Sequence, residues 1–251
     1  MCEWELHGDI GVLTLSNPPQ NYINEPEFVD LNDLKSWTDN DSLKGMIIRG
    51  KGRHFCAGFN REEIFKITDR SFLYDSLRKS EKILYYLEDL PIPVIGAITG
   101  VCFGAGLELV LSCDIRVCSN KALLAFPETE FGIIPGFNGT IRLPKRLGIR
   151  HPMEMIMTGK TLHSDEALSI GVVDYVVPSK EVFDYSLNLL EKYARTPVSV
   201  IHAAMKAVNN ARKLPWNVAS KEETNLVAGL VLEKIKMGRD VASDAHKPGA
   251  E

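Results

Sequence analysis

Short apolar blocks separated by glycine, proline and polar turns dominate the first half of the chain, and helical spacing dominates the second half. Apolar runs of this length between turn residues are typical of buried strands. A polar turn at 7–9 lies between the first two blocks and therefore predicts a hairpin. The blocks predict strands at residues 4–6, 10–15, 45–49, 94–98, 115–118 and 122–126.

Helical periodicity begins with four apolar residues for which Asn24 is the expected N-cap. These four are Phe28, Leu31, Leu34 and Trp37. Segment 69–90 predicts a long amphipathic helix, which Pro91 ends because proline cannot continue a helix. Strands early and helices late predict a mixed α/β core followed by a helical region. Further helix starts are expected at Pro152, Pro197 and Pro215, and Ser164 is expected to cap another helix.

The stretch 99–109 interrupts the apolar pattern with small residues between a strand at 94–98 and a helix expected from Leu107. Backbone N–H groups at a helix start lack partners within the helix, so they favour negative charge. Glu108 lies about one turn into this helix. The glycines alone are equally consistent with close helix–sheet packing. A second group of small residues interrupts an apolar segment at 54–60.

Composition and charge exclude several classes of protein. A chain of 251 residues with 45% hydrophobic content can bury a full core, and its net charge of −4 argues against a sequence-independent nucleic-acid surface. No apolar run reaches membrane-spanning length, and the histidines show no metal-ligand spacing. Five cysteines without metal-site pairing are most simply reduced thiols. We therefore expect a soluble cytoplasmic protein without a metal site, a nucleic-acid partner or membrane contact.

Many short segments, in order, resemble the crotonase superfamily of enoyl-CoA hydratases and isomerases, from about Trp4 to about Pro178. No single segment is specific, but their number, order and spacing are. They are NPP at 17–19 with Asn24, FCAGFN at 55–60, GVCFGAGLE at 100–108, CDIR at 113–116, PE at 127–128, GIIPG at 132–136, GT at 139–140, RL at 142–143, TGK at 158–160 and EA at 166–167.

The resemblance implies an α/β fold, a crotonase-like spiral of repeated ββα units with a C-terminal helical region. Residues 1–195 are then expected to form the spiral core with the acyl-thioester site. Residues 196–251 are expected to form a helical oligomerisation region, giving a homotrimer or a homohexamer. Apolar residues between 226 and 235 support this expectation, because a single exposed helix seldom carries so many.

The resemblance also implies an oxyanion hole built from the backbone N–H groups of Ala57 and Ala105. Charge collects on the thioester oxygen during the reaction, and donors aimed at it are worth roughly 3–4 kcal/mol each. Ala105 stands where the family usually has glycine. Other residues expected to bind substrate are Cys56, Gly58, Asn60, Gly104, Phe126, Phe131 and Gly136.

Two carboxylates, Glu108 and Glu128, occupy the catalytic positions of the family's hydratases. Hydration requires deprotonation of water and protonation of carbon, so one carboxylate and one carboxylic acid can divide the work. Family isomerases generally keep only the later carboxylate, so the pair favours a lyase. We expect a hydratase acting on an acyl-CoA in fatty acid metabolism, with no cofactor beyond the coenzyme A of the substrate.

Three departures from the family pattern keep other activities open: Asn60 replaces a common acidic residue, Asn138 a frequent glycine, and Phe126 helps to shape the pocket. They suggest an unusual acyl group. Isomerase or decarboxylase activity, including activity on a carrier-protein thioester in polyketide-type biosynthesis, therefore remains an alternative. A non-catalytic binding protein of the same fold is another, although such a protein is expected to lose a catalytic carboxylate or gain a basic face. His54 is a weaker candidate for a catalytic residue.

Overall fold

The computed structural model describes residues 2–25 and 27–244, and their side chains as far as residue 236. Within these residues the strands form two sheets. The larger sheet has the order β1 (Cys2–His7), β2 (Ile10–Leu15), β3 (Gly45–Gly50), β4 (Val94–Ile98), β6 (Ile115–Ser119) and β9 (Tyr175–Val177). The smaller sheet has the order β5 (Val101–Phe103), β7 (Leu123–Ala125) and β8 (Leu162–His163).

The hairpin predicted at the N-terminus is confirmed, because β1 and β2 pair antiparallel and His7 lies opposite Ile10. From β2 to β9 the larger sheet is parallel. Its central strands are buried on both faces, which explains why they appear in the sequence as continuous apolar runs and not as alternating ones.

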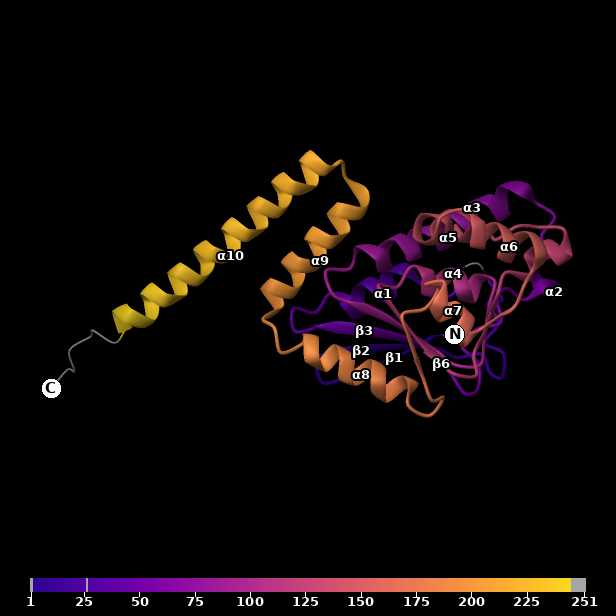
Figure 1. Cartoon of the computed structure of the whole chain (residues 1–251), viewed down its shortest axis with the longest axis horizontal. Helices are drawn as coiled ribbons and strands as arrows, with labels where there is room; N and C mark the ends of the chain where they lie inside the picture. Colours follow the sequence, from indigo (N-terminus) through magenta and orange to yellow (C-terminus); the bar gives the residue numbers. More distant parts are fainter. Residues whose placement is uncertain (1, 26, 245–251) are drawn as a thin grey trace.

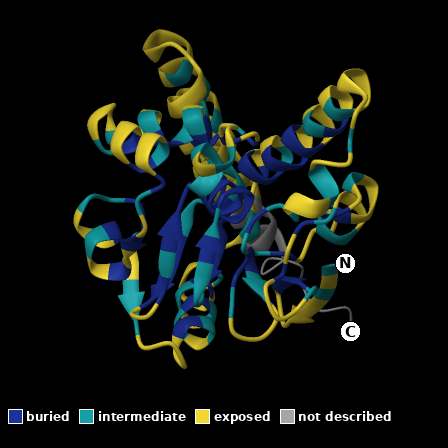
Figure 2. Cartoon of the chain, turned by 90° about the vertical axis from the view of Figure 1, so that its right-hand side faces the viewer, coloured by how far each residue is buried: buried dark blue, intermediate teal, exposed yellow. Residues whose placement is uncertain are grey.

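Helices cover both faces of the larger sheet (Figure 1). The main core packs strand residues such as Ile48 and Ile98 against α1 (Leu31–Thr38), α3 (Arg70–Asp89) and α4 (Ala105–Leu111). A second core on the opposite face packs Ile47 and Ile95 against α8 (Val182–Tyr193). Figure 2 shows the central strands buried and much of the surface of the outer helices exposed, whereas β1 is mostly exposed. The remaining helical segments are α2 (Arg61–Ile64), η1 (Pro127–Phe131), α5 (Gly139–Leu147), α6 (Arg150–Thr158), α7 (Ser164–Ser169), α9 (Val198–Lys213) and α10 (Trp216–Asp244).

Successive turns of chain repeat one ββ-helix pattern. β4 lies in the larger sheet, β5 lies in the smaller sheet, and α4 follows. β6, β7 and η1 repeat that order. Because each turn changes sheets before its helical segment, α4 and η1 both begin directly after strands of the smaller sheet. This repetition brings Glu108 on α4 and Glu128 on η1 to the same part of the molecule.

Several local expectations were wrong, among them the helix start at Pro152, because α6 begins two residues earlier, at Arg150. The first helix begins at Leu31, and its N-cap is Asp30, whose carboxylate accepts from the N–H groups of the next turn. Asn24 accepts instead from Nδ2 of Asn60 at 3.1 Å. The helix expected from Leu107 begins at Ala105, because β5 brings the chain to the turn earlier. Ser164 is the first residue of its helix and not the cap.

The long helix predicted at 69–90 is confirmed as α3, capped by Asp69. At the other end of the chain, α9 and α10 extend away from the body as an arm (Figure 1). The arm exposes large apolar side chains, including Trp216, which is 86% exposed. None of the described helices is long and apolar enough to cross a membrane. Within the described part of the chain, no group of three or more His, Cys, Asp or Glu side chains is arranged to hold a metal ion.

Candidate active site

The turn between β5 and α4 is built around Gly104, whose φ of +51° favours glycine. Ala105 is the first residue of α4, so its N–H has no acceptor within the helix. No other described residue accepts from it. A Cβ atom placed on Gly58, in the loop after β3, would lie 3.5 Å from the Ala105 nitrogen. The two loops therefore meet at this helix start.

Glu108 lies one turn further along α4 and is only 1% exposed. Its Oε1 accepts from the N–H of Phe137 at 2.8 Å and from the N–H of Gly139 at 2.7 Å. Burial raises the pKa of Glu108 to about 7, although these hydrogen bonds and the charge of Arg142 oppose the rise. This carboxyl group therefore changes charge near neutral pH.

Glu128 lies on η1, beside Gly104. Its Oε2 is buried and has no hydrogen-bond partner among the described residues. Burial, with a second contribution from the charge of Glu108, raises the pKa of Glu128 to about 8. The structure therefore brings the two glutamates close enough for their charges to interact, although they are far apart in sequence.

A cleft of about 430 Å³ opens at Glu128. Aromatic and aliphatic side chains form much of its wall, and the Arg61 guanidinium stacks over the Phe131 ring at 4.0 Å. Its lining residues are Gln20, Tyr22, His54, Ala57, Gly58, Phe59, Arg61, Ile64, Val101, Phe103, Gly104, Pro127, Glu128, Glu130, Phe131 and Ile133. A larger hollow of about 560 Å³ lies between α9, α10 and the end of α3. Glu128 lines the cleft and not that hollow. Glu108 lines neither, but its charge acts on Glu128, so we assign the site to the cleft.

Comparisons with known proteins agree with this geometry. The sequence profile of the enoyl-CoA hydratase/isomerase family matches residues 5–247. The chain belongs to the enoyl-CoA hydratase/isomerase family. The family and the crotonase-like fold that the sequence predicted are thereby confirmed.

Two curated relatives are about one third identical to this chain over the aligned residues. The fatty acid oxidation complex subunit alpha of Vibrio parahaemolyticus is 34% identical over 212 residues, which are 80% of this chain and 30% of the relative. The protein of the same name from Idiomarina loihiensis is 32% identical over 231 residues, 85% of this chain and 32% of the relative. The chain thus spans about a third of the length of these relatives.

Solved structures match over nearly the whole chain. The enoyl-CoA hydratase of Bacillus anthracis superposes with a TM-score of 0.87 at 26% identity, covering 99% of this chain and 98% of that one. DspI of Pseudomonas aeruginosa superposes with a TM-score of 0.83 at 28% identity, covering 92% of this chain and 95% of that one.

Ala57 does not supply the free oxyanion donor that the family resemblance implied. Its N–H donates to the carbonyl of Gln20 at 3.0 Å. Two residues on, Phe59 forms a parallel bridge with Ile23, which donates to the Gly58 carbonyl and accepts from the Asn60 N–H. This pattern leaves the N–H of Phe59 pointing away from Ile23. The N–H of Phe59 has no partner among the described residues, so Phe59 replaces Ala57 as the candidate donor beside Ala105.

Other family-implied binding residues divide between the cleft and the interior. Gly58, Gly104 and Phe131 line the cleft. The lining does not include the buried side chains of Cys56 and Phe126, which pack in the main core. Their apolar character suits that core as well as it suits a pocket, so sequence alone does not separate the two roles.

Asn60 and Gly136 also lie outside the cleft lining. Asn60 caps α2 by accepting from the N–H of Glu62 at 3.1 Å. The N–H of Gly136 is close enough to Glu108 to lower its pKa. Gly136 therefore helps to set the pKa of Glu108, whereas Asn60 stabilises the start of α2.

His54, a weak candidate in the sequence, lines the cleft. Its Nδ1 accepts from the N–H of Val101 at 3.0 Å, so the neutral ring carries its proton on Nε2. Partial burial and the nearby Arg53 charge lower the pKa of His54. A neutral imidazole at this position offers the cleft a hydrogen-bond donor.

Proposed function

We propose that this protein is an enoyl-CoA hydratase, which adds water across the α,β double bond of an acyl thioester. One observation carries the proposal: Glu128 lines an apolar cleft, and Glu108, buried behind it, is close enough for the two charges to interact, both carboxyls having raised pKa values. Hydration needs a base for water and an acid for carbon at the same moment. A carboxyl pair that titrates near neutral pH supplies both.

The two glutamates differ in a way that assigns their roles. Two backbone N–H groups hold Oε1 of Glu108, which favours its charged form. Glu128 has no such donors on Oε2 and has the higher pKa. The pair therefore shares one proton most readily with Glu108 ionised and Glu128 protonated. Glu108 takes the proton from water as the oxygen attacks the β-carbon, and Glu128 gives its proton to the α-carbon.

The thioester oxygen gains negative charge during this addition. The free N–H groups of Ala105 and Phe59 supply two donors on adjoining loops: Phe59 lines the cleft, and Ala105 directly follows the lining residue Gly104. Each preorganised donor of this kind is worth roughly 3 kcal/mol. Their positions support an oxyanion hole formed by these two residues.

Several further features of the proposal follow from the site and the relatives. The substrate is proposed to be an acyl-CoA of fatty acid metabolism, because both curated relatives are named as subunits of a fatty acid oxidation complex. All five cysteines are unpaired, which supports a reducing compartment and hence a cytoplasmic location. No cofactor is required by the proposed proton transfers.

We also propose that copies of this chain assemble through α9 and α10 into a trimer or a hexamer. The arm exposes apolar side chains on a helix that has little of the body beside it (Figure 1). Val227, Val231, Leu232 and Ile235 are all exposed in the single chain. A second copy is the occupant that matches this surface, because a long apolar helix face without cover is unfavourable in water.

Labelled water tests the proposed reaction. The protein is incubated with a short or medium-chain enoyl-CoA in 18O water, and the product is analysed by mass spectrometry. Hydration predicts gain of one water with 18O at the β-carbon. Glu108→Gln and Glu128→Gln are each expected to lower the rate strongly and to leave thioester affinity nearly unchanged, because the amide is nearly isosteric but does not transfer the proton.

Other outcomes identify the alternatives. Conversion without mass change, with Glu108→Gln still active and Glu128→Gln inactive, indicates an isomerase. Loss of CO2 from a carboxylated acyl thioester indicates a decarboxylase. Reaction only with a carrier-protein thioester indicates that the substrate is an acyl-carrier-protein thioester and not an acyl-CoA. Inertness toward every thioester, in a protein that still binds acyl-CoA, favours a binding role.

A further inference from the structure

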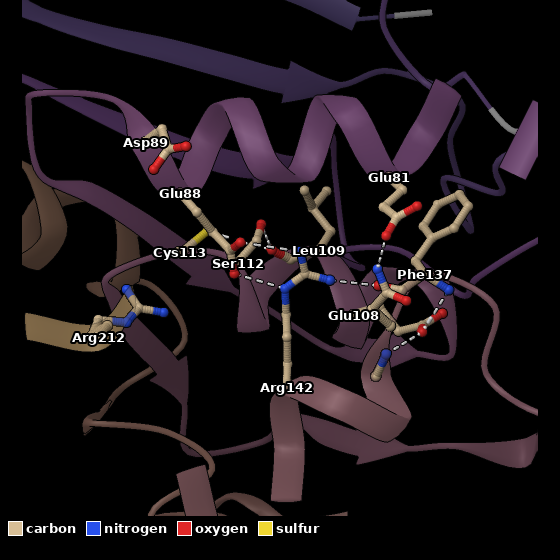
Figure 3. A network of polar contacts seen from close by, with 12 residues as sticks. Glu81, Glu88, Asp89, Glu108, Leu109, Ser112, Cys113, Phe137, Arg142 and Arg212 are labelled. Atoms are coloured by element: carbon tan, nitrogen blue, oxygen red, sulfur yellow. Dashed lines mark hydrogen bonds and ion pairs between the residues drawn. The ribbon is translucent and has the colours of Figure 1, made fainter. Parts of the chain in front are cut away.

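Arg142, on α5, lies between α3 and the loop that holds Glu108 (Figure 3). Its Nε and Nη2 donate to the two carboxylate oxygens of Glu88, at 2.7 and 3.2 Å. Its Nη1 donates to the carbonyl of Phe137 at 2.6 Å. Both members of the ion pair are largely buried. A two-pronged contact of this kind fixes the orientation of the guanidinium plane.

The loop 137–139 is therefore held on two sides. Its N–H groups at Phe137 and Gly139 donate to Glu108, while its Phe137 carbonyl accepts from Arg142. The side chain of Asn138 donates to Glu81 of α3 at 2.8 Å. Asn138 adopts a φ of +68°, a left-handed conformation that orients the two N–H groups toward the same oxygen. A displacement of the peptide at Phe137 is therefore expected to shift both N–H groups that donate to Glu108.

We propose that Arg142, oriented by Glu88, is a positioning residue for Glu108. It fixes the peptide groups that aim the Glu108 carboxylate, and it does not touch the reacting atoms. This inference rests on the proposed hydratase function, in which Glu108 is the base.

Charge gives Arg142 a second effect on Glu108. The positive guanidinium opposes the rise in the pKa of Glu108 that burial causes, and Glu128, on η1, is the other titratable group whose pKa is coupled to the charge of Glu108. Arg142 itself faces Glu88 and the ring of Tyr85 from α3, the ring centroid lying 5.5 Å away. Loss of the guanidinium is therefore expected to raise the pKa of Glu108.

Two variants separate geometry from charge. Arg142→Met removes both the charge and the hydrogen bonds. Arg142→Lys keeps a charge but not the fork that joins Glu88 to the Phe137 carbonyl. Arg146→Met is the matched control, because Arg146 lies one turn later on α5 and contacts Asp174 and the Gly171 carbonyl, away from Glu108. The double variant Glu88→Gln with Arg142→Met removes both buried charges and tests whether folding survives.

Both kinetics and carboxyl titration are measured. Arg142→Met is expected to lower kcat by about tenfold or more while KM changes by less than about threefold, and to move the acidic limb of the pH profile upward. Arg142→Lys is expected to lower kcat similarly but to keep the acidic limb near that of the unaltered protein. Arg146→Met is expected to leave kcat and the pH profile unchanged. Titration of 13C-labelled glutamate carboxyls by NMR, assigned with Glu108→Gln, follows the pKa of Glu108 directly.

Separate outcomes overturn this inference and the proposed function. Folded Arg142→Met with unchanged kcat, and with an unchanged Glu108 titration, overturns the positioning role. Lower thermal stability with an unaltered pH profile in the folded fraction also overturns it, because a purely structural contact predicts that result. If the unaltered protein has no hydratase activity, the proposed function fails. The NMR titration of Glu108 in Arg142→Met and Arg146→Met then still decides whether Arg142 controls this carboxyl group.

Discussion

The Glu128 carboxyl packs directly against Gly104 at the cleft. A Cβ atom on Gly104 would lie 2.5 Å from Oε1 of Glu128. Real Cβ atoms do not approach an oxygen that closely, and the φ of Gly104 is also positive. The same turn places the Ala105 N–H at the start of α4. One glycine thus fixes both the position of the proposed acid and that of an oxyanion donor.

Gly104→Ala is therefore expected to displace the Glu128 carboxyl and to lower kcat by about a hundredfold, because a shift of about 1 Å at a catalytic group has an effect of that size. Gly132→Ala is the matched control. Gly132 also has a positive φ, +75°, but a Cβ there meets nothing within 4 Å. Steady-state hydration kinetics on both variants check the prediction. Equal losses in the two variants would show that backbone strain, and not contact with Glu128, causes the defect.

The glutamate pair also predicts how activity depends on pH. Below about pH 7 both carboxyls are protonated and the base is missing, and above about pH 8 both are ionised and the acid is missing. A plot of kcat/KM against pH is expected to be bell-shaped and narrow, with its maximum between these values. Measurement of hydration rates at constant ionic strength checks this. A plateau across that range contradicts the shared proton.

The strand and helix starts around the site show in the local sequence pattern, whereas the roles of its residues were implied by the resemblance to the family. Glu108 and Ala105 follow a buried strand and begin a helix, and both features appear within one short stretch. Glu128 follows a strand in the same way, directly after Pro127. The apolar blocks also predicted the central strands, because a strand buried on both faces must be apolar throughout.

Contacts between distant segments account for what sequence did not predict. Phe59 replaces Ala57 as the candidate donor because Ile23, 36 positions earlier, pairs with Phe59 in a bridge. The link from Arg142 to Glu88 joins residues 54 positions apart. No local pattern specifies which N–H group such a pairing leaves free, or which buried carboxylate a guanidinium will meet.

Ala105→Pro tests the oxyanion donor with little risk to the fold, because proline is well tolerated at the first position of a helix. Loss of this N–H is expected to lower kcat by about a hundredfold or more, equivalent to about 3 kcal/mol of transition-state stabilisation. Arg70→Pro, at the first position of α3, is the matched control and is expected to keep normal kcat. Circular dichroism checks that both variants retain their helices. Near-normal turnover in folded Ala105→Pro would exclude the donor role.

The proposed oligomer is tested on the exposed face of α10. Light scattering of the unaltered protein is expected to give three or six times the chain mass of 28.0 kDa. Leu232→Asp, at a position 59% exposed in the single chain, is expected to shift the protein toward monomer, because it introduces a charge into a buried apolar contact. Leu6→Asp is the control, because Leu6 is 52% exposed on β1. A monomer at micromolar concentration in the unaltered protein contradicts the assembly.

Glu108 also makes stability depend on pH in a direction opposite to that of most carboxylates. Its pKa rises from an ordinary value of 4.5 to about 7 on folding, so the folded chain binds this proton more tightly than the unfolded chain. Below about pH 4.5 the Glu108 carboxyl is protonated in both the folded and the unfolded chain, so it costs no stability. Between about pH 4.5 and 7 the free energy of unfolding falls as pH rises. At 1.36 kcal/mol for each pKa unit, the full loss is roughly 3 kcal/mol.

Glu108→Gln replaces the titrating carboxyl with an uncharged amide. This variant is therefore expected to be more stable than the unaltered protein near pH 8, and its stability is expected to decline less steeply from about pH 5 upward. Glu191→Gln, at an exposed position on α8, is the control and is expected to follow the unaltered protein. Urea unfolding at fixed protein concentration, repeated across this pH range, measures the free energy of unfolding of all three proteins. If Glu108→Gln declines in parallel with the unaltered protein, the buried Glu108 carboxyl does not titrate in this range, and its assignment as a base poised near neutral pH fails with it.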